Sequence, residues 1–362
     1  MYAFPPTLGT PRLRIYSETL PYEEVAAPRT VHLLARYGLE IVLAVRPWQL
    51  AMLPRTVQTL RDADVSVSVW PMIADEDGRW ASAHNADRVV AFARSTVDAL
   101  EAARLPPRDV LLDLEPPFSQ ARALTKSMRR ASAASCASAS EASARGTRGT
   151  RESARETREA LRTAPRARIA QAEKALGALV ADLAARGIEA SCAVWPLVAL
   201  DPPDDRGWQT LLGTPVDALG AAHVSAMVYT SMLEGWSRGT LRRRDVAALL
   251  DAATARVVSR WKERGGVSLG CVGTGAFEDE PVYRDPSELA EDTAVVRAAG
   301  CEHLALFDLG GVLARSPAES WLDAFTEASD ARPFAQPKTT KRVFAARKLV
   351  RAATWALRRR GT

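Results

Sequence analysis

The sequence predicts a single (β/α)8 barrel, in which eight parallel strands close into a cylinder that helices surround. Eight short apolar runs follow one another along the chain, and a segment with apolar residues at helical spacing follows each of them. The 362 residues contain no second block of elements large enough for another domain. An open, doubly wound sheet is the main alternative. However, no G-x-G-x-x-G motif follows the first strand, so nothing supports a dinucleotide site in such a sheet.

The predicted strands are short apolar or alternating runs. They are Leu13–Tyr16, Ile41–Val45, Val65–Trp70, Val110–Glu115, Ser191–Val198, Val224–Tyr229, Val267–Val272 and His303–Leu309. The predicted helices are Tyr22–Tyr37, Leu50–Leu60, Asn85–Arg104, Ile169–Leu183, Trp208–Leu219, Val246–Trp261, Glu288–Ala299 and Trp321–Ala328. Asn85, Asp285 and Ser316 are placed to cap helices, the last with Glu319 in a capping box, and Gly187 ends a helix.

Composition divides the chain into a barrel and two basic segments. The barrel spans residues 1–330 and is interrupted at 116–165 by a low-complexity insertion rich in Ser, Ala and Arg, which buries too little apolar surface to offset its ordering entropy. Residues 331–362 form a basic tail. Residues 116–170 carry a net charge of +8 and the tail carries +10, so the rest of a chain with total charge +5 carries −13. The basic character therefore belongs to these segments and does not indicate nucleic-acid binding.

The sequence indicates neither a cofactor nor a resident metal ion. Its four cysteines and four histidines show no metal-ligand spacing, and we expect the cysteines to be free thiols in a reducing compartment. No stretch approaches about eighteen unbroken apolar residues, so a transmembrane helix is not expected. The amino terminus lacks a basic start followed by an apolar block, so a secretory signal is not expected either. The expected location is the cytoplasm or the periphery of a membrane.

The stretch Asp109–Pro117, which reads DVLLDLEPP, places two carboxylates at the end of the fourth predicted strand. Alternate side chains of a strand share a face, so Asp113 and Glu115 point the same way and lie within about 7 Å of each other. Buried carboxylates are costly unless they meet water, a partner or a substrate. This arrangement is typical of an acid/base pair. The alternative is that the two residues cap a helix or pair with arginines.

The barrel prediction also indicates where a site lies, because the active sites of such barrels occupy the carboxyl ends of the strands. Polar and aromatic residues gather at these ends, and they are Ser17, Glu18, Arg46, Trp48, Trp70, Asp113, Glu115, Trp195, Tyr229, Thr230, Thr274 and Asp308. Carboxylates beside Trp and Tyr are typical of a carbohydrate site, where indole faces stack on sugar rings. Packing is the alternative role for Trp70 and Trp195, and an ion pair is the alternative for Glu18 and Arg46.

The loop after the third predicted strand, ADEDGRWASAHN, adds further candidates. They are Asp75, Glu76, Trp80 and His84. Of these, Trp80 is a candidate for contact with a sugar. The loop can equally be a solvated acidic segment without a function.

Two short motifs resemble glycoside hydrolase family 18, the chitinase-like barrels. Asp113-Leu114-Glu115 followed by Pro116 looks like the last half of that family's D-x-x-D-x-D-x-E signature, and Met227-Val228-Tyr229 looks like its M-x-Y-D element. The resemblance implies that Glu115 is the general acid, that Asp113 orients the substrate acetamido group, and that Tyr229 steadies the intermediate formed by that group.

This chain departs from the family pattern at several positions. Leu111 and Arg108 stand where earlier aspartates are expected, and Thr230 replaces the aspartate after the tyrosine. The eighth predicted strand contains no tryptophan. A barrel that binds carbohydrate without hydrolysing it, or one that serves as a scaffold, therefore stays open as an alternative.

The chemistry of the pair leads to the same enzyme class. A glycosidase needs one carboxyl group with a raised pKa, to protonate the leaving oxygen, and a second negative group or substrate group to support the oxocarbenium-like centre. We expect Glu115 to be the protonated member, since Asp113 lies close enough to disfavour ionisation of both. Asp308 or Glu18 is the candidate partner for a mechanism with two separate carboxylates. The sequence thus favours a glycosidase that acts on an N-acetylated or related polysaccharide.

The tail at 338–360 reads as a basic amphipathic helix. Its apolar side is predicted to hold Val343, Ala346, Leu349, Val350, Ala353 and Leu357. Its opposite side is predicted to hold Arg347, Lys348, Arg351 and Arg358, with Phe344 and Trp355 among them. Such a helix can lie on an anionic membrane surface or dock on a partner. A solvated, frayed terminus is the alternative.

Overall fold

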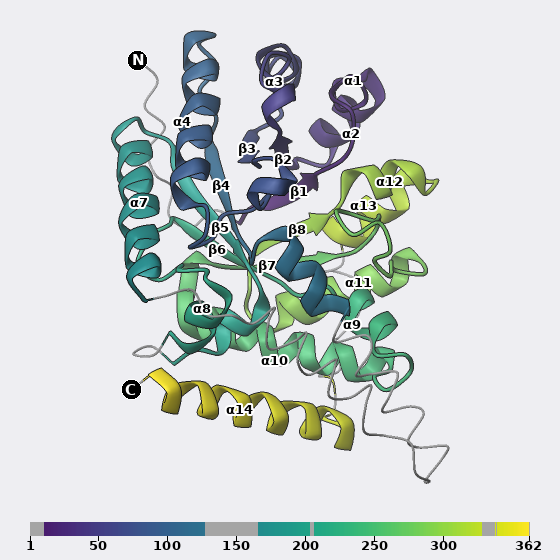
Figure 1. Ribbon diagram of the computed structural model, residues 1–362. Helices are drawn as coiled ribbons and strands as arrows, with labels where there is room; N and C mark the ends of the chain where they lie inside the picture. The colour runs from purple at the N-terminus through teal and green to yellow at the C-terminus, as the bar shows by residue number, and fades with distance from the viewer. Residues whose placement is uncertain (1–10, 127–165, 203–205, 328–336, 338, 362) are drawn as a thin grey trace.

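The computed structural model confirms the predicted barrel. It describes residues 11–126, 166–202, 206–327, 337 and 339–361 (Figure 1). The strands are β1 (Leu13–Ser17), β2 (Glu40–Val45), β3 (Val67–Pro71), β4 (Asp109–Leu114), β5 (Glu189–Val194), β6 (His223–Met227), β7 (Gly265–Gly270) and β8 (His303–Phe307). Each pairs in parallel with the next along the chain, and β8 pairs with β1, which closes the barrel.

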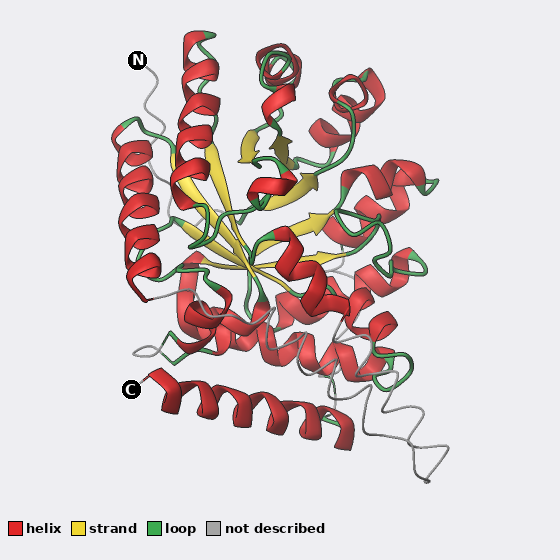
Figure 2. Cartoon of the chain, viewed as in Figure 1, coloured by secondary structure: helices red, strands yellow, loops and turns green. Residues whose placement is uncertain are grey.

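Helices surround the strands (Figure 2). They are α1 (Tyr22–Val25), α2 (Pro28–Arg36), α3 (Leu53–Arg61), α4 (Ala86–Ala102), α7 (Arg166–Ala185), α8 (Gly207–Leu212), α9 (Thr230–Trp236), α10 (Arg243–Trp261), α11 (Pro286–Ala298), α12 (Leu309–Ala314), α13 (Ala318–Thr326) and α14 (Lys341–Gly361). Short 3-10 helices are η1 (Pro47–Gln49), η2 (Asp75–Asp77), η3 (Pro196–Leu200) and η4 (Lys262–Arg264). The single helix predicted at 22–37 is two helices, because Pro28, which lacks an N–H, begins a new one.

Strand β4 shows how the sheet sorts its side chains between two apolar clusters. Leu111 packs inside the barrel with residues such as Tyr16 and Trp70. The alternate residues Val110, Leu112 and Leu114 belong to the larger core, which includes the inner faces of the helices. The same alternation places Asp109 and Asp113 on the inward side with Leu111. The strand thus presents a carboxylate at each end of the barrel and a leucine between them.

The predicted helix caps are confirmed in part. Asp285 caps α11, where its side chain accepts from the Ser287 N–H. Ser316 does not cap α13, whose N-cap position is held by Pro317 without a side-chain bond. Asn85 occupies the N-cap position of α4 but makes no cap bond. Its side chain instead stabilises the preceding loop. It accepts from the Ser82 N–H and donates to the carbonyl groups of Asp77 and Trp80.

The insertion and the tail differ from their predictions in extent. Residues 118–126 at the start of the predicted insertion are helical, and Ala121 and Leu124 are buried. The following residues, 127–165, lie outside the described residues, and α7 then resumes the barrel at Arg166. The tail forms α14, in which Val343, a residue of the predicted apolar side, is buried. The described chain holds no helix with the length and apolar character needed to cross a bilayer.

Candidate active site

The predicted acidic pair lies at the carboxyl end of β4, inside the mouth of the barrel. Asp113 is 4% exposed and Glu115 is 8% exposed. The loop after β3 runs beside this strand end: the Ala81 N–H donates to the Asp113 carbonyl at 2.8 Å, and the Glu115 N–H donates to the Ala81 carbonyl at 3.2 Å. These two backbone bonds fix the strand end, and with it the point from which both carboxyl groups project.

The pKa values of both carboxyl groups are raised, because burial disfavours their charged forms. The charges of Glu115 and Glu18 raise the pKa of Asp113 further. A hydrogen bond between the two carboxyl groups raises the pKa of Asp113 and lowers that of Glu115, whose pKa is raised overall to about 7. The raised pKa of Glu115 has the direction that a general acid needs, and the assignment of the proton to Glu115 stays a prediction.

Trp195 and Tyr229 flank the pair. The Trp195 Nε1–H donates to Glu115 Oε2 at 2.5 Å, which favours the carboxylate form of Glu115. Trp195 is therefore a hydrogen-bond donor to the acid, and this contact is more specific than the stacking or packing role that the sequence suggested. Tyr229 is half-buried near both carboxyl groups. Burial is the largest cause of its raised pKa, followed by the neighbouring Tyr16 and Cys271 and then by the charges of Asp113 and Glu115.

Glu18 and Arg46 do not pair with each other, contrary to the alternative that the sequence left open. Arg79, from the loop after β3, binds Glu18 Oε1 at 2.9 Å and also binds Asp75 Oδ2 at 2.7 Å. Arg46 binds Asp75 Oδ1 at 2.5 Å, and its guanidinium group lies over the ring of Trp48. The four residues thus form a chain of ion pairs along the rim from β1 to β2. Burial raises the pKa of Glu18 to about 7 despite the charge of Arg79.

Two further carboxyl groups lie at the mouth. Asp308 begins α12, where it accepts from the Gly311 N–H at 3.0 Å, and burial raises its pKa to about 6. Glu280 accepts from the Phe277 N–H at 2.9 Å, while its buried Oε2 has no hydrogen-bond partner within the described residues. Asp308 and Glu280 both act on the pKa of Glu18, which indicates that the three groups are close in space. No cluster of metal-ligating side chains occurs in the described part of the chain.

Aromatic rings also pack against one another in the interior apolar cluster that includes Leu111. Trp80 packs edge-on against Phe118, and Phe118 stacks on Phe277 with ring centroids 5.6 Å apart. Trp80 is thus a buried packing residue. The same holds for Trp70, which meets Tyr16 edge-on at 5.5 Å inside the barrel. Trp48, beside Arg46, is 65% exposed and presents its ring at the rim.

Sequence reasoning missed four contributors to this site, namely Arg79, Phe118, Phe277 and Glu280. Phe118 was assigned to the insertion, and Phe277 and Glu280 lie in an irregular segment after β7. Arg79 carried one usable signal, since it follows Asp75 by four residues and pairs with it. Arg79 also has φ +60°, a left-handed conformation that the local sequence does not predict.

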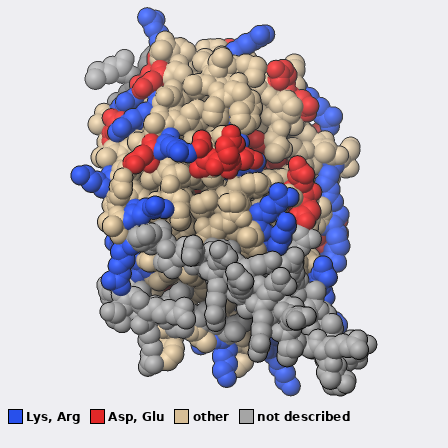
Figure 3. Space-filling view, viewed as in Figure 1, with Lys and Arg blue, Asp and Glu red and all other residues tan. Residues whose placement is uncertain are grey.

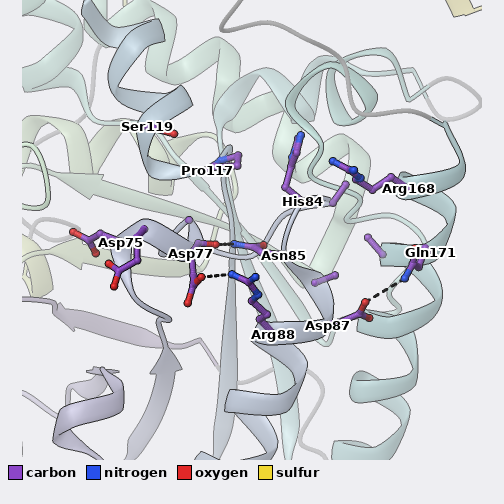
Figure 4. A pocket seen from close by; sticks show the side chains of 15 residues that line it. Asp75, Asp77, His84, Asn85, Asp87, Arg88, Pro117, Ser119, Arg168 and Gln171 are labelled. Atoms are coloured by element: carbon purple, nitrogen blue, oxygen red, sulfur yellow. Dashed lines mark hydrogen bonds and ion pairs between the residues drawn. The ribbon is translucent and has the colours of Figure 1, made fainter.

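A separate polar cavity of about 530 Å³ lies beside the mouth, between the loop after β3, the start of α4 and the start of α7 (Figure 4). Asp75, Asp77, His84 and Arg168 line it, whereas neither Asp113 nor Glu115 does. Figure 3 shows Asp and Glu gathered across the middle of one face of the molecule, with Lys and Arg beside them.

Comparison with solved structures returns glycoside hydrolases, chitinases and sugar epimerases. They include the PgaB glycoside hydrolase domain from Bordetella bronchiseptica, with 12% identity over 87% of this chain and 99% of that one and a TM-score of 0.46. A class V chitinase from Pseudomonas fluorescens Pf-5 has 13% identity over 88% and 99%, with a TM-score of 0.49. D-allulose 3-epimerase from a Methylomonas species has 13% identity over 89% and 94%, with a TM-score of 0.42.

Chitinase-like barrels are therefore among the proteins to which this chain is similar, as the sequence motifs suggested. The epimerase and the class V chitinase match this chain with the same identity. No protein-family model matches the sequence, and no curated protein matches it. The fold and site define a (β/α)8 barrel with a buried acidic pair at its mouth.

Proposed function

We propose that this protein is a glycosidase that cleaves an N-acetylated or related polysaccharide, with Glu115 as general acid and base. The observation that carries the proposal is the pairing of Glu115 with Asp113, both with raised pKa values, beside Tyr229. No guanidinium group forms an ion pair with Glu115 within the described residues, so its carboxyl group is not neutralised there. A carboxyl group in this state can hold a proton near neutral pH and give it to a leaving oxygen.

Each neighbour of Glu115 has a separate role in this mechanism. Asp113, whose pKa is raised well above its usual range by burial, holds a proton that it can donate to Glu115 or to a substrate group. The Trp195 N–H stabilises the Glu115 carboxylate that remains after the proton has been transferred. The Tyr229 hydroxyl, with its pKa raised, stays protonated and can donate to a developing negative charge. The exposed ring of Trp48 offers a stacking surface for a sugar at the rim.

The test is hydrolysis of chitin oligosaccharides and poly-N-acetylglucosamine, measured as new reducing ends. The Glu115→Gln variant keeps the shape of the side chain but cannot act as an acid, so turnover should fall by roughly a hundredfold to ten-thousandfold. Glu302→Gln is the matched control, because Glu302 is exposed next to the opposite end of β8. Equal turnover of wild type and Glu115→Gln would contradict the proposal.

A barrel that binds carbohydrate without cleaving it is the second candidate. One observation favours it: Leu111, at a position where the resembled motif has an aspartate, is buried in the apolar interior next to Asp113 along the inward face. Thr230, which replaces the other motif aspartate, is buried and bound to Asp292 away from the acidic pair. Calorimetric binding of these oligosaccharides by wild type, without release of reducing ends, would select this candidate.

A further inference from the structure

One side of the carboxyl-terminal helix α14 packs against the barrel, where hydrogen bonds and an ion pair hold it. At its start, the Thr340 hydroxyl donates to Asp245 Oδ1 at 2.6 Å, and Arg342 lies 3.7 Å from the same carboxylate. Farther along, the Trp208 Nε1–H donates to Thr354 Oγ1 at 2.9 Å. The helix therefore lies across α8 and α10, as Figure 1 shows at the bottom of the molecule. Both halves of α14 are anchored, so the orientation of the helix about its own axis is fixed.

An exposed flank of α14, next to the side that contacts α8 and α10, presents two large aromatic rings in line with cationic side chains. Phe344 is 64% exposed and Trp355 is 53% exposed. Between them Lys348 and Arg351 are exposed on the same stripe, since positions i, i+4, i+7 and i+11 of a helix lie on one face. Arg347 lies next to this stripe and is also exposed. We call these five residues the α14 outer face.

The chemistry of this outer face is specific. Within the described residues, Arg347, Lys348 and Arg351 make no ion pair with a carboxylate, so their charges are available to a negatively charged partner. Indole and phenyl rings favour the region between lipid headgroups and acyl chains, and lysine and arginine beside them favour anionic headgroups. A folded partner protein would need a matching acidic and apolar groove, whereas a bilayer accepts this pattern without shape complementarity.

We propose that the α14 outer face binds the surface of an anionic lipid bilayer and holds the barrel against it. The binding is peripheral, with Phe344 and Trp355 entering the headgroup region and the basic residues contacting phosphate and carboxylate groups. The inner face of α14 stays on the barrel, so no part of the protein unfolds on binding. The inference does not depend on the proposed enzymatic activity.

The test is co-sedimentation of the full-length protein with vesicles. It should bind mixed phosphatidylcholine–phosphatidylserine vesicles at low salt, bind pure phosphatidylcholine weakly, and dissociate as salt is raised. The double variant Lys348→Glu/Arg351→Glu should bind the mixed vesicles at least roughly tenfold more weakly. The variant Phe344→Ala/Trp355→Ala should also bind more weakly, with the tryptophan fluorescence change on vesicle addition lost. Circular dichroism verifies that each variant is folded.

The matched control is Arg55→Glu/Arg61→Glu, which makes the same change in charge at exposed positions on α3. This variant should bind vesicles as wild type does. The proposal is overturned if wild type fails to bind the mixed vesicles, or if the α14 and α3 variants lose binding equally. It is also overturned if the outer-face variants abolish only self-association in gel filtration, because the partner would then be a second copy of the chain.

Discussion

The two ends of the barrel both bury charged side chains, yet they balance those charges in opposite ways. At the amino-terminal end, Arg12 and Arg14 lie among Glu40 and Asp109, with distances from 2.6 to 3.7 Å. Although burial alone would raise it, the pKa of Glu40 is lowered by the charges of both arginines. At the mouth the carboxyl groups outnumber their partners, and the pKa values of Glu18, Asp308 and the acidic pair are raised.

This difference separates a structural use of buried charge from the chemical use that we propose for the mouth. In a network where each carboxylate pairs with a guanidinium group, the pairing offsets the cost of desolvation. Removing one partner leaves the other charge buried and destabilises the fold. A cluster with too few cations keeps carboxyl groups protonated near neutral pH, at a cost in stability that a proton-transfer site can justify. In β4 both uses occur on one strand face, with Asp109 at one end, Asp113 at the other and Leu111 between them.

The largest expected effect comes from breaking the amino-terminal network. Arg14 contacts Glu40 and Asp109 and donates to Ser191 Oγ at 3.0 Å. Arg14→Met therefore removes the nearer guanidinium partner of the buried Asp109 and leaves Glu40 with Arg12 as its remaining close partner. The free energy of unfolding should fall by about 3–5 kcal/mol, measured by urea denaturation. Arg186→Ala is the control, because its ion pairs lie at the surface, and its midpoint should not move measurably. A midpoint for Arg14→Met equal to that of the control would contradict this comparison.

The stability contribution of a carboxyl group at the mouth should fall as pH rises, which is the opposite of what the lowered pKa of Glu40 predicts for the amino-terminal end. The pKa of Glu18 is raised from 4.5 to about 7 by burial, so the folded state binds the extra proton. Its contribution to stability is complete below pH 4.5 and is lost as pH rises through 7, by up to about 3 kcal/mol. The Glu18→Gln variant should lack this component, seen as a flatter plot of unfolding free energy against pH. An unchanged pH dependence in the variant would mean that Glu18 titrates normally.

The smallest expected effect concerns the donor to the candidate acid. Replacing Trp195 by Phe keeps an aromatic ring and removes the hydrogen bond to Glu115 Oε2. That bond favours the carboxylate, so the pKa of Glu115 should rise by about one further unit. Carbon NMR of the labelled Glu115 carboxyl group during a pH titration measures the shift directly, without a substrate. A pKa that stays constant would show that the Trp195 N–H does not act on Glu115.

The sequence was sufficient for the barrel because period-two and helical patterns are local properties of the chain. Asp285 was predicted to begin α11 and does so, since a cap depends on residues close in sequence. Ser316 was expected to cap α13 for the same reason, but Pro317 takes the N-cap position. The end of the regular chain after β4 was placed too early, because the apolar residues at 118–126 are sparse and bury themselves only against the barrel.

In the candidate site, too, some features follow from the local sequence and others depend on the tertiary structure. That Asp113 and Glu115 share a face follows from the pleat of a strand, and the sequence alone determined it. How far the pKa of each is raised depends on Glu18, Trp195 and other groups from other strands, because a pKa is set by the full surroundings of a group. The tertiary structure alone decided this, along with the pairing of Arg79 with Glu18. Local pattern thus fixes which side chains reach the mouth, and long-range proximity fixes their charge.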